Sequence, residues 1–145
     1  MKILERFILS RMKSTIIEHY GSDQFSFRPQ SSTTCALIAI DDFITATIDR
    51  PEVEGVQMVA YDLSKAFDKL KYDVILSRLC TCRISPVVVS WFANYFTNRK
   101  QFVKVGTECS HMIDVTSGVP QGSVIGPFIF SLVAGSFNFD PNNCY

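Results

Sequence analysis

The run Val56–Leu63 constrains the fold more than any other part of the chain. It is short, largely apolar and contains β-branched valines, which predicts a buried β-strand. This strand would end on Asp62, and a carboxylate is costly to bury unless a cation or hydrogen-bond donors compensate. Ligands gather at strand ends of open sheets, and Mg²⁺ prefers carboxylate oxygens. Asp62 is therefore either half of a metal site or the N-cap of the turn that follows.

Helical patterns surround this strand on both sides. The spacing of apolar residues predicts helices over about residues 3–19, 32–48, 73–79, 86–98 and 123–133. Ser31 or Ser32 would cap the second helix, and Ser85–Pro86 is a strong start signal for the fourth. The apolar face predicted for the first helix consists of Ile3, Phe7, Ile8, Met12 and Ile16.

Two further runs alternate between apolar and polar residues. They cover residues 101–105 and 112–115, and the turn 106–110 between them predicts a β-hairpin. Because helices are mixed with a strand and a hairpin, we expect an α+β fold with helices packed on a small antiparallel sheet.

An uncharged run from residue 115 to 139 resembles a membrane segment in hydropathy alone. It contains several glycines and prolines that would break a spanning helix, so a loop followed by a buried helix is expected. Charged residues interrupt the apolar N-terminus, which excludes a secretory signal. The five cysteines are odd in number and irregularly spaced, which favours reduced thiols over a disulfide framework or a zinc site. These features predict an intracellular protein, nuclear or cytoplasmic, with no membrane contact.

The formal net charge of zero hides an asymmetry along the chain. Residues 62–104 have a net charge of +5, whereas residues 29–61 have −4 and residues 105–145 have −3. Such a block is either an ordinary solvated face or a contact surface for nucleic-acid phosphates. Its basic residues are Lys65, Lys69, Lys71, Arg78, Arg83, Arg99, Lys100 and Lys104.

The segment Ser117–Ser123 places a proline and a glutamine between two glycines. Such a loop can be approached closely, and Gln121 can both donate and accept hydrogen bonds. It leads into a helix N-terminus, which favours phosphate. An ordinary connector between hairpin and helix is the alternative.

Taken together, these segments resemble the reverse transcriptase family, specifically that of LINE-like retrotransposons without long terminal repeats. Val59–Asp68 resembles the first catalytic palm motif, and Ser117–Pro127 resembles the second. Gln24–Pro29 with Ser31–Thr34 resembles the fingers motif, and Trp91–Gln101 resembles the connector of the LINE type. The resemblance implies the fingers and an incomplete palm of a right-hand polymerase.

The resemblance also implies a role for each matching residue. Asp62 would be the catalytic carboxylate that binds both metals, together with the backbone carbonyl of Leu63. Phe67 would lie under the nucleotide sugar, Gln121 would contact the incoming nucleotide, and Arg28 would face its triphosphate. The implied cofactor is Mg²⁺ or Mn²⁺, and the implied partners are an RNA template, a DNA primer and a dNTP. Two-metal transfer of a nucleotide to the primer is the implied reaction.

The third palm motif of the family, a hairpin with two adjacent aspartates, has no match in the sequence. Asp41–Asp42 lies inside a predicted helix, and Asp140 is isolated before a proline. We therefore expect a partial reverse transcriptase domain over residues 1–132 and an off-pattern tail over 133–145. One carboxylate is a poor two-metal site, so this chain alone would bind metal weakly and be inactive. The alternatives are a non-catalytic nucleic-acid or nucleotide-binding module and a non-functional relic that aggregates.

Overall fold

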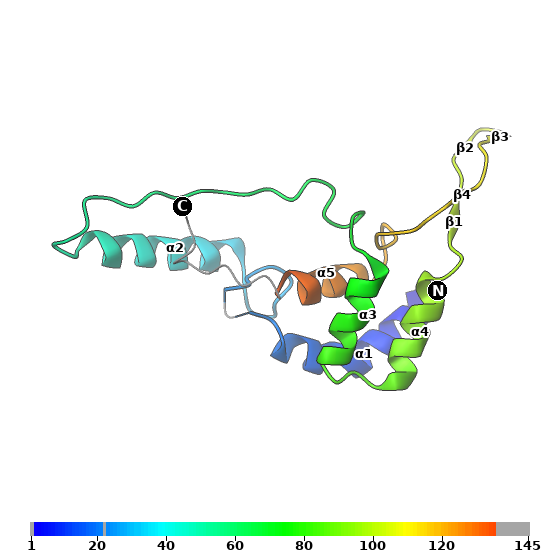
Figure 1. Cartoon of the computed structure of the whole chain (residues 1–145), viewed down its shortest axis with the longest axis horizontal. Coiled ribbons are helices and arrows are strands. Elements are labelled where there is room, and N and C mark those ends of the chain that lie inside the picture. Colours follow the sequence, from blue (N-terminus) through cyan, green and yellow to red (C-terminus); the bar gives the residue numbers. More distant parts are fainter. Residues whose placement is uncertain (1, 22, 136–145) are drawn as a thin grey trace.

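A computed structural model describes residues 2–21 and 23–135 of the chain (Figure 1). The helices are α1 (Lys2–Glu18), α2 (Thr33–Ile48), α3 (Tyr72–Thr81), α4 (Pro86–Phe96) and α5 (Gly126–Ala134). The strands are β1 (Lys100–Gln101), β2 (Lys104–Val105), β3 (Glu108–Cys109) and β4 (Ile113–Asp114).

Four of the helices form one hydrophobic core. In this helical core, α3 packs against both α4 and α5, and α1 packs against α5 (Figure 1). Phe92 of α4 and both Ile129 and Leu132 of α5 are completely buried at its centre. Burial of such side chains is the main source of stability in a domain of this size.

The buried face of α1 differs from the predicted one. Ile8, Met12 and Ile16 are buried as expected, but Ile3 and Phe7 are exposed. The place of a fourth apolar residue is taken by Glu5, which is only 4% exposed. The prediction was wrong for Ile3 and Phe7 because the face of α1 that packs against α5 begins at residue 5.

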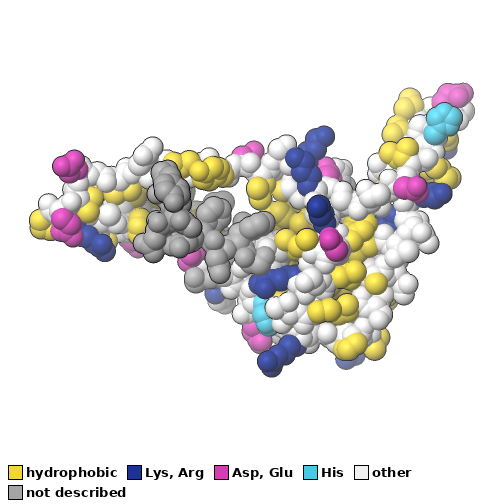
Figure 2. Space-filling view, viewed as in Figure 1, with side chains coloured by type: hydrophobic (Ala, Val, Ile, Leu, Met, Phe, Trp, Pro, Cys, Tyr) yellow, Lys and Arg dark blue, Asp and Glu magenta, His cyan; other side chains and the backbone are white. Residues whose placement is uncertain are grey.

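A second region, residues 33–63, extends away from the helical core, and we call it the arm (Figure 1). It consists of α2 and the extended segment that returns from its end toward α3. Ser32 caps α2 as predicted, because its hydroxyl accepts a hydrogen bond of 3.2 Å from the Cys35 amide. No residue of α2 is buried, and hydrophobic side chains appear on the surface of the arm in Figure 2.

The prediction of a buried strand over Val56–Leu63 is wrong. The segment is extended but pairs with no strand among the described residues. Met58, Val59 and Leu63 are all exposed, and so is Tyr61. An apolar, β-branched run favours extended backbone, but strand formation depends on a neighbouring strand, which this part of the structure does not offer.

The predicted hairpin is confirmed, with a tighter turn than expected. Strand β1 pairs with β4 and β2 pairs with β3, both antiparallel, around a turn at Gly106 and Thr107 rather than over 106–110. The hairpin projects from the end of α4 and its strands are exposed (Figure 1). The mixture of helices and strands is confirmed, but in the described part the helices pack on one another rather than on an antiparallel sheet.

Local signals place the starts of most helices correctly. Pro86 lies at the start of α4, and α5 begins at Gly126, three residues later than expected, with Pro127 in its first turn. The described part of the uncharged run, residues 115–135, forms a loop and then α5. No helix within the described ranges is both long and apolar enough to cross a membrane. The tail predicted over 133–145 continues α5 to Ala134, and its residues 136–145 lie outside the described residues.

Candidate functional site

Two segments that are distant in sequence are joined by hydrogen bonds. The Gly118 amide donates to the Leu70 carbonyl at 2.8 Å, and the Val119 amide donates to the Phe67 carbonyl at 3.0 Å. The Ser117 hydroxyl donates to the Asp68 carbonyl at 2.9 Å. The two segments that resemble palm motifs therefore meet at residues 67–70 and 117–119.

Gly118 makes this junction possible. Its φ of +85° lies in the region that side chains other than glycine rarely adopt. A Cβ atom here would also lie 2.8 Å from the Asp68 carbonyl oxygen and 2.9 Å from the Asp68 Cα. Both the backbone conformation and the close approach require glycine at this position.

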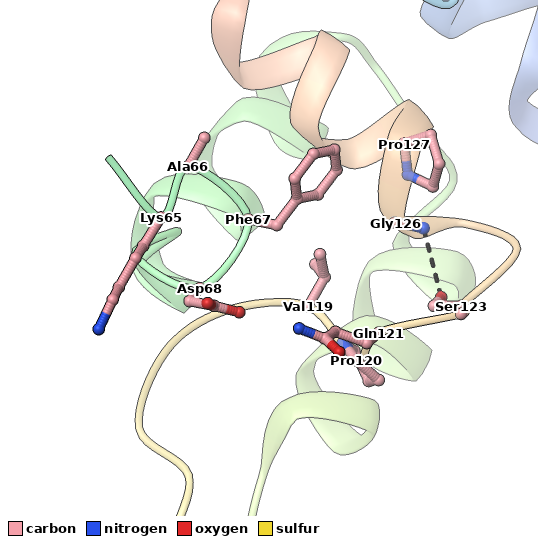
Figure 3. Close-up of a pocket in the computed structure, with 11 residues that line it drawn as sticks. Lys65, Ala66, Phe67, Asp68, Val119, Pro120, Gln121, Ser123, Gly126 and Pro127 are labelled. Carbon is pink, nitrogen blue, oxygen red and sulfur yellow. Dashed lines mark hydrogen bonds between the residues drawn. The ribbon is translucent and has the colours of Figure 1, made fainter. Parts of the chain in front are cut away.

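A pocket of about 410 Å³ lies at this junction (Figure 3). One wall comes from the turn 65–68, and the other comes from residues 119–123 and the start of α5. The Phe67 ring points toward α5 and packs against Phe130, with ring centroids 4.7 Å apart. The pocket is thus apolar on the α5 side.

Gln121 lies at the open edge of the pocket, at the tip of a tight turn. The Ser123 amide donates to the Pro120 carbonyl at 3.0 Å, and Gly122 adopts a positive φ of +73°. In Figure 3 the carboxylate of Asp68 and the amide of Gln121 lie at the same edge, below the Phe67 ring, and Lys65 points away. The structure therefore brings Phe67 and Gln121 together at one pocket.

Arg28 does not line this pocket. It is exposed in a turn after α1, where Phe27 adopts a positive φ of 57°. The Phe27 ring meets Phe67 edge-on, with ring centroids 6.4 Å apart. This contact connects the segment that resembles the fingers motif to the pocket.

Asp62 and Leu63 lie in the exposed extended segment and are not part of the pocket lining. The described part of the chain contains no group of three or more His, Cys, Asp or Glu side chains that could hold a metal ion. Asp41 and Asp42 lie in α2, as predicted, and are exposed. Within the described ranges, Asp62 is therefore not part of such a metal-binding group. Cys35, Cys80, Cys82 and Cys109 are free thiols.

The residues of the basic block lie in different surroundings. Five of its members line two hollows of about 640 and 700 Å³ that lie next to the pocket: Lys65, Lys69, Lys71, Arg99 and Lys100. Arg78 instead is half-buried, and its side chain donates to the Leu132 carbonyl at 3.3 Å. Lys104 lies on the projecting hairpin. The same hollows are also lined by Asp68, Asp73 and Asp114, and Lys100 forms an ion pair of 3.8 Å with Asp114. The lining of the two hollows therefore has more basic than acidic residues, but it is not uniformly basic.

Sequence reasoning missed Glu5, which anchors the loop beside the pocket. Its carboxylate accepts hydrogen bonds from the Val124 amide at 2.8 Å and the Ser123 hydroxyl at 3.1 Å. It also accepts one from the Tyr95 hydroxyl at 3.2 Å, and burial together with this carboxylate raises the pKa of Tyr95. The available signal was its position three residues before Ile8, in register with the buried stripe of α1.

The chain is similar to one known protein family and to several known proteins. The family model for reverse transcriptase (RNA-dependent DNA polymerase) matches residues 1–144. The RNA-directed DNA polymerase from mobile element jockey of Drosophila funebris is 29% identical over 133 residues, which cover 90% of this chain. The probable RNA-directed DNA polymerases from transposon BS and transposon X-element of Drosophila melanogaster are 29% and 28% identical, each over 90% of the chain.

These relatives are much longer than the chain. It spans about 14% of the length of each of them. No solved structure matches the chain.

Proposed function

Because the chain belongs to the reverse transcriptase family of LINE-like, non-long-terminal-repeat retrotransposons, we propose that it supplies the nucleotide-facing wall of an RNA-directed DNA polymerase. The observation that supports this most strongly is the junction of the turn 65–68 with the loop 117–123. These two segments resemble consecutive palm motifs, and hydrogen bonds hold them around one pocket.

In this proposal, residues 1–132 form the fingers and the N-terminal half of the palm. Phe67 is the apolar floor under the nucleotide sugar and excludes a ribose 2′-hydroxyl by its bulk. Gln121 contacts the nucleotide through an amide that can both donate and accept. We assign to Arg28, whose guanidinium matches phosphate geometry, the contact with the triphosphate, since the neighbouring Phe27 ring meets Phe67 at the pocket.

The family generally uses Mg²⁺, and the described residues do not fit a two-metal site. Two close cations repel each other and need several carboxylates, whereas Asp62 is exposed and apart from the pocket. We therefore assign no metal-dependent step to this chain. We propose that it binds Mg²⁺ weakly and, by itself, does not extend a primer.

Nucleotide binding tests the proposed role of the pocket directly. Titration of the chain with a dNTP, followed by NMR or calorimetry, is expected to show saturable binding that Gln121→Ala and Phe67→Ala weaken. The matched controls are Gln57→Ala and Phe43→Ala, since both residues are exposed and lie in the arm. Equal weakening by the controls, or no binding at all, would contradict the proposal.

Primer extension tests the second part. On an RNA template with Mg²⁺ or Mn²⁺, the purified chain is expected to give no extension product. Robust extension that disappears in Asp62→Ala would show that the chain is catalytically sufficient, against our proposal.

A non-catalytic nucleic-acid-binding module is the second candidate function. The five basic residues around the two hollows favour it, because they outnumber the three aspartates there and because clustered Lys and Arg side chains neutralise backbone phosphates. It predicts binding to an RNA–DNA duplex whose affinity falls with salt concentration, and charge reversal at Arg99, Lys100 and Lys104 should weaken binding and reduce the salt dependence. Binding that is unchanged by these reversals would exclude this surface.

A further inference from the structure

Glu5 is a buried charged residue that has no role in the proposed nucleotide contacts. A carboxylate is rarely buried unless it is well satisfied, because desolvation of the charge is unfavourable. Glu5 is satisfied by three donors that come from two distant parts of the chain, the loop 123–124 and helix α4. A buried group with this many long-range partners restrains whatever it holds.

The loop that Glu5 holds is the one with Gln121 at its tip. On one side of the tip, the Val119 amide is fixed to the Phe67 carbonyl at 3.0 Å. On the other side, Ser123 and Val124 both donate to one oxygen of Glu5, Oε2, at 3.1 and 2.8 Å. Only Gln121 and Gly122 lie exposed between these two anchors.

The carboxylate is itself fixed in orientation. Its other oxygen, Oε1, accepts the hydrogen bond from Tyr95, whose ring stacks on Trp91 with centroids 4.8 Å apart. The guanidinium of Arg99 lies over the same tyrosine ring, 5.1 Å from its centroid. Rigid support of this kind is what holds a functional side chain within a narrow range of positions.

We propose that Glu5 is a positioning residue, which fixes the loop 119–124 so that Gln121 is presented at the edge of the pocket. The proposal rests on the proposed function for the identity of the ligand, a dNTP. The restraint on the loop rests only on the contacts of Glu5.

Hydrogen exchange in the chain tests the restraint on the loop. Glu5→Gln keeps the shape but removes the charge. Its amide oxygen can still accept from Ser123 and Val124 while its amide nitrogen donates to the Tyr95 hydroxyl, so the bonds to the loop become neutral and weaker. We expect amide exchange over residues 119–126 to accelerate about tenfold, because hydrogen bonds to a charged group are stronger than neutral ones. Exchange over residues 92–96 of α4 should not change. Glu18→Gln, an exposed glutamate on the same helix, is the control.

Nucleotide titration tests the consequence for Gln121. Glu5→Gln should weaken dNTP binding by a factor similar to its effect on loop exchange, and Glu18→Gln should not. Uniformly faster exchange across the chain would show that Glu5 only stabilises the fold, which would overturn the proposal. Faster loop exchange with unchanged dNTP affinity would also overturn it. If the wild-type chain binds no dNTP, both the proposed function and the role of Glu5 in nucleotide binding are wrong. Hydrogen exchange then still decides whether Glu5 anchors the loop.

Ser123→Ala provides a second variant in case Glu5→Gln does not fold. It removes one donor to Glu5 and leaves Glu5 bonded to Val124 and Tyr95, so local acceleration and loss of dNTP affinity are expected at smaller size. It also removes the acceptor of the Gly126 amide, so the comparison uses residues 119–124 only. In the double variant Glu5→Gln, Ser123→Ala, the two effects should add less than fully, because both act on the hydrogen bond between Ser123 and Glu5. Full additivity would contradict the proposed contact.

Discussion

The helical core and the arm are both rich in apolar side chains, but these side chains lie in opposite environments. Both contain helices with many apolar side chains, yet Phe92 in α4 is completely buried whereas Phe43 in α2 is 65% exposed. The core residues find partners on α1, α3, α4 and α5. No side chain of α2 is buried, so its helix depends on its cap and its own backbone hydrogen bonds. An apolar pattern therefore predicts that a helix forms, but not that the same chain buries it.

The strongest test of this contrast is Phe92→Ala. Truncation of a completely buried phenylalanine leaves a cavity, so we expect the free energy of unfolding to fall by about 3–5 kcal/mol. Chemical denaturation of the chain measures this loss. A loss below about 1 kcal/mol would mean that the core is not the stable unit.

Gly118→Ala tests the junction at which the core supports the pocket. The positive φ and the clash with the Asp68 backbone should together cost about 1–3 kcal/mol and increase exchange of the Gly118 and Val119 amides. Gly55→Ala in the arm is the matched control, because it has no positive φ and no atom within 4 Å of the added Cβ. Equal losses of stability in Gly118→Ala and Gly55→Ala would show that a side chain at position 118 does not strain the junction.

Ser32→Ala tests what holds the arm together. Loss of the N-cap should cost α2 about 1 kcal/mol of local stability, seen as faster exchange at the start of α2. Ser85→Ala is the comparison, because Ser85 precedes α4 but makes no side-chain capping bond. A larger effect for Ser85→Ala would reverse the assignment of caps.

Phe43→Ala should have the smallest effect. An exposed phenylalanine gives little packing energy and alanine is the better helix former, so we expect a change within about 0.5 kcal/mol, neutral or slightly stabilising. Chemical denaturation, the same experiment as for Phe92→Ala, measures this change in the free energy of unfolding. A loss comparable to that of Phe92→Ala would show that the arm is packed in solution.

Local rules in the sequence predicted the helices well. The cap at Ser32 and the proline at position 86 mark helix starts through interactions within a few residues, which the sequence displays directly. The strand over 56–63 could not be predicted in the same way, since pairing depends on segments distant in sequence. The exposure of Ile3 and Phe7 also depends on where α5 lies, which periodicity alone does not define.

The candidate site was predictable in part for the same reason. Motif resemblance identified Phe67 and Gln121, and the structure places both at one pocket. Glu5 was missed because an acidic residue in an amphipathic helix ordinarily faces solvent. Its role is defined by Ser123 and Val124, more than a hundred residues along the chain, and no local pattern contains that information.

The hydrogen bonds between residues 67–70 and 117–119 also have a consequence for the order of folding. The bond from Ser117 to Asp68 closes a loop across a sequence separation of 49 residues, and closing a long flexible loop has an entropic cost. Helices α3 and α4 lie within this loop and pack against each other, which brings its ends closer together beforehand. We therefore expect α3 and α4 to dock early and the two palm-like segments to join late. A slow step in refolding should then report on assembly of the pocket itself.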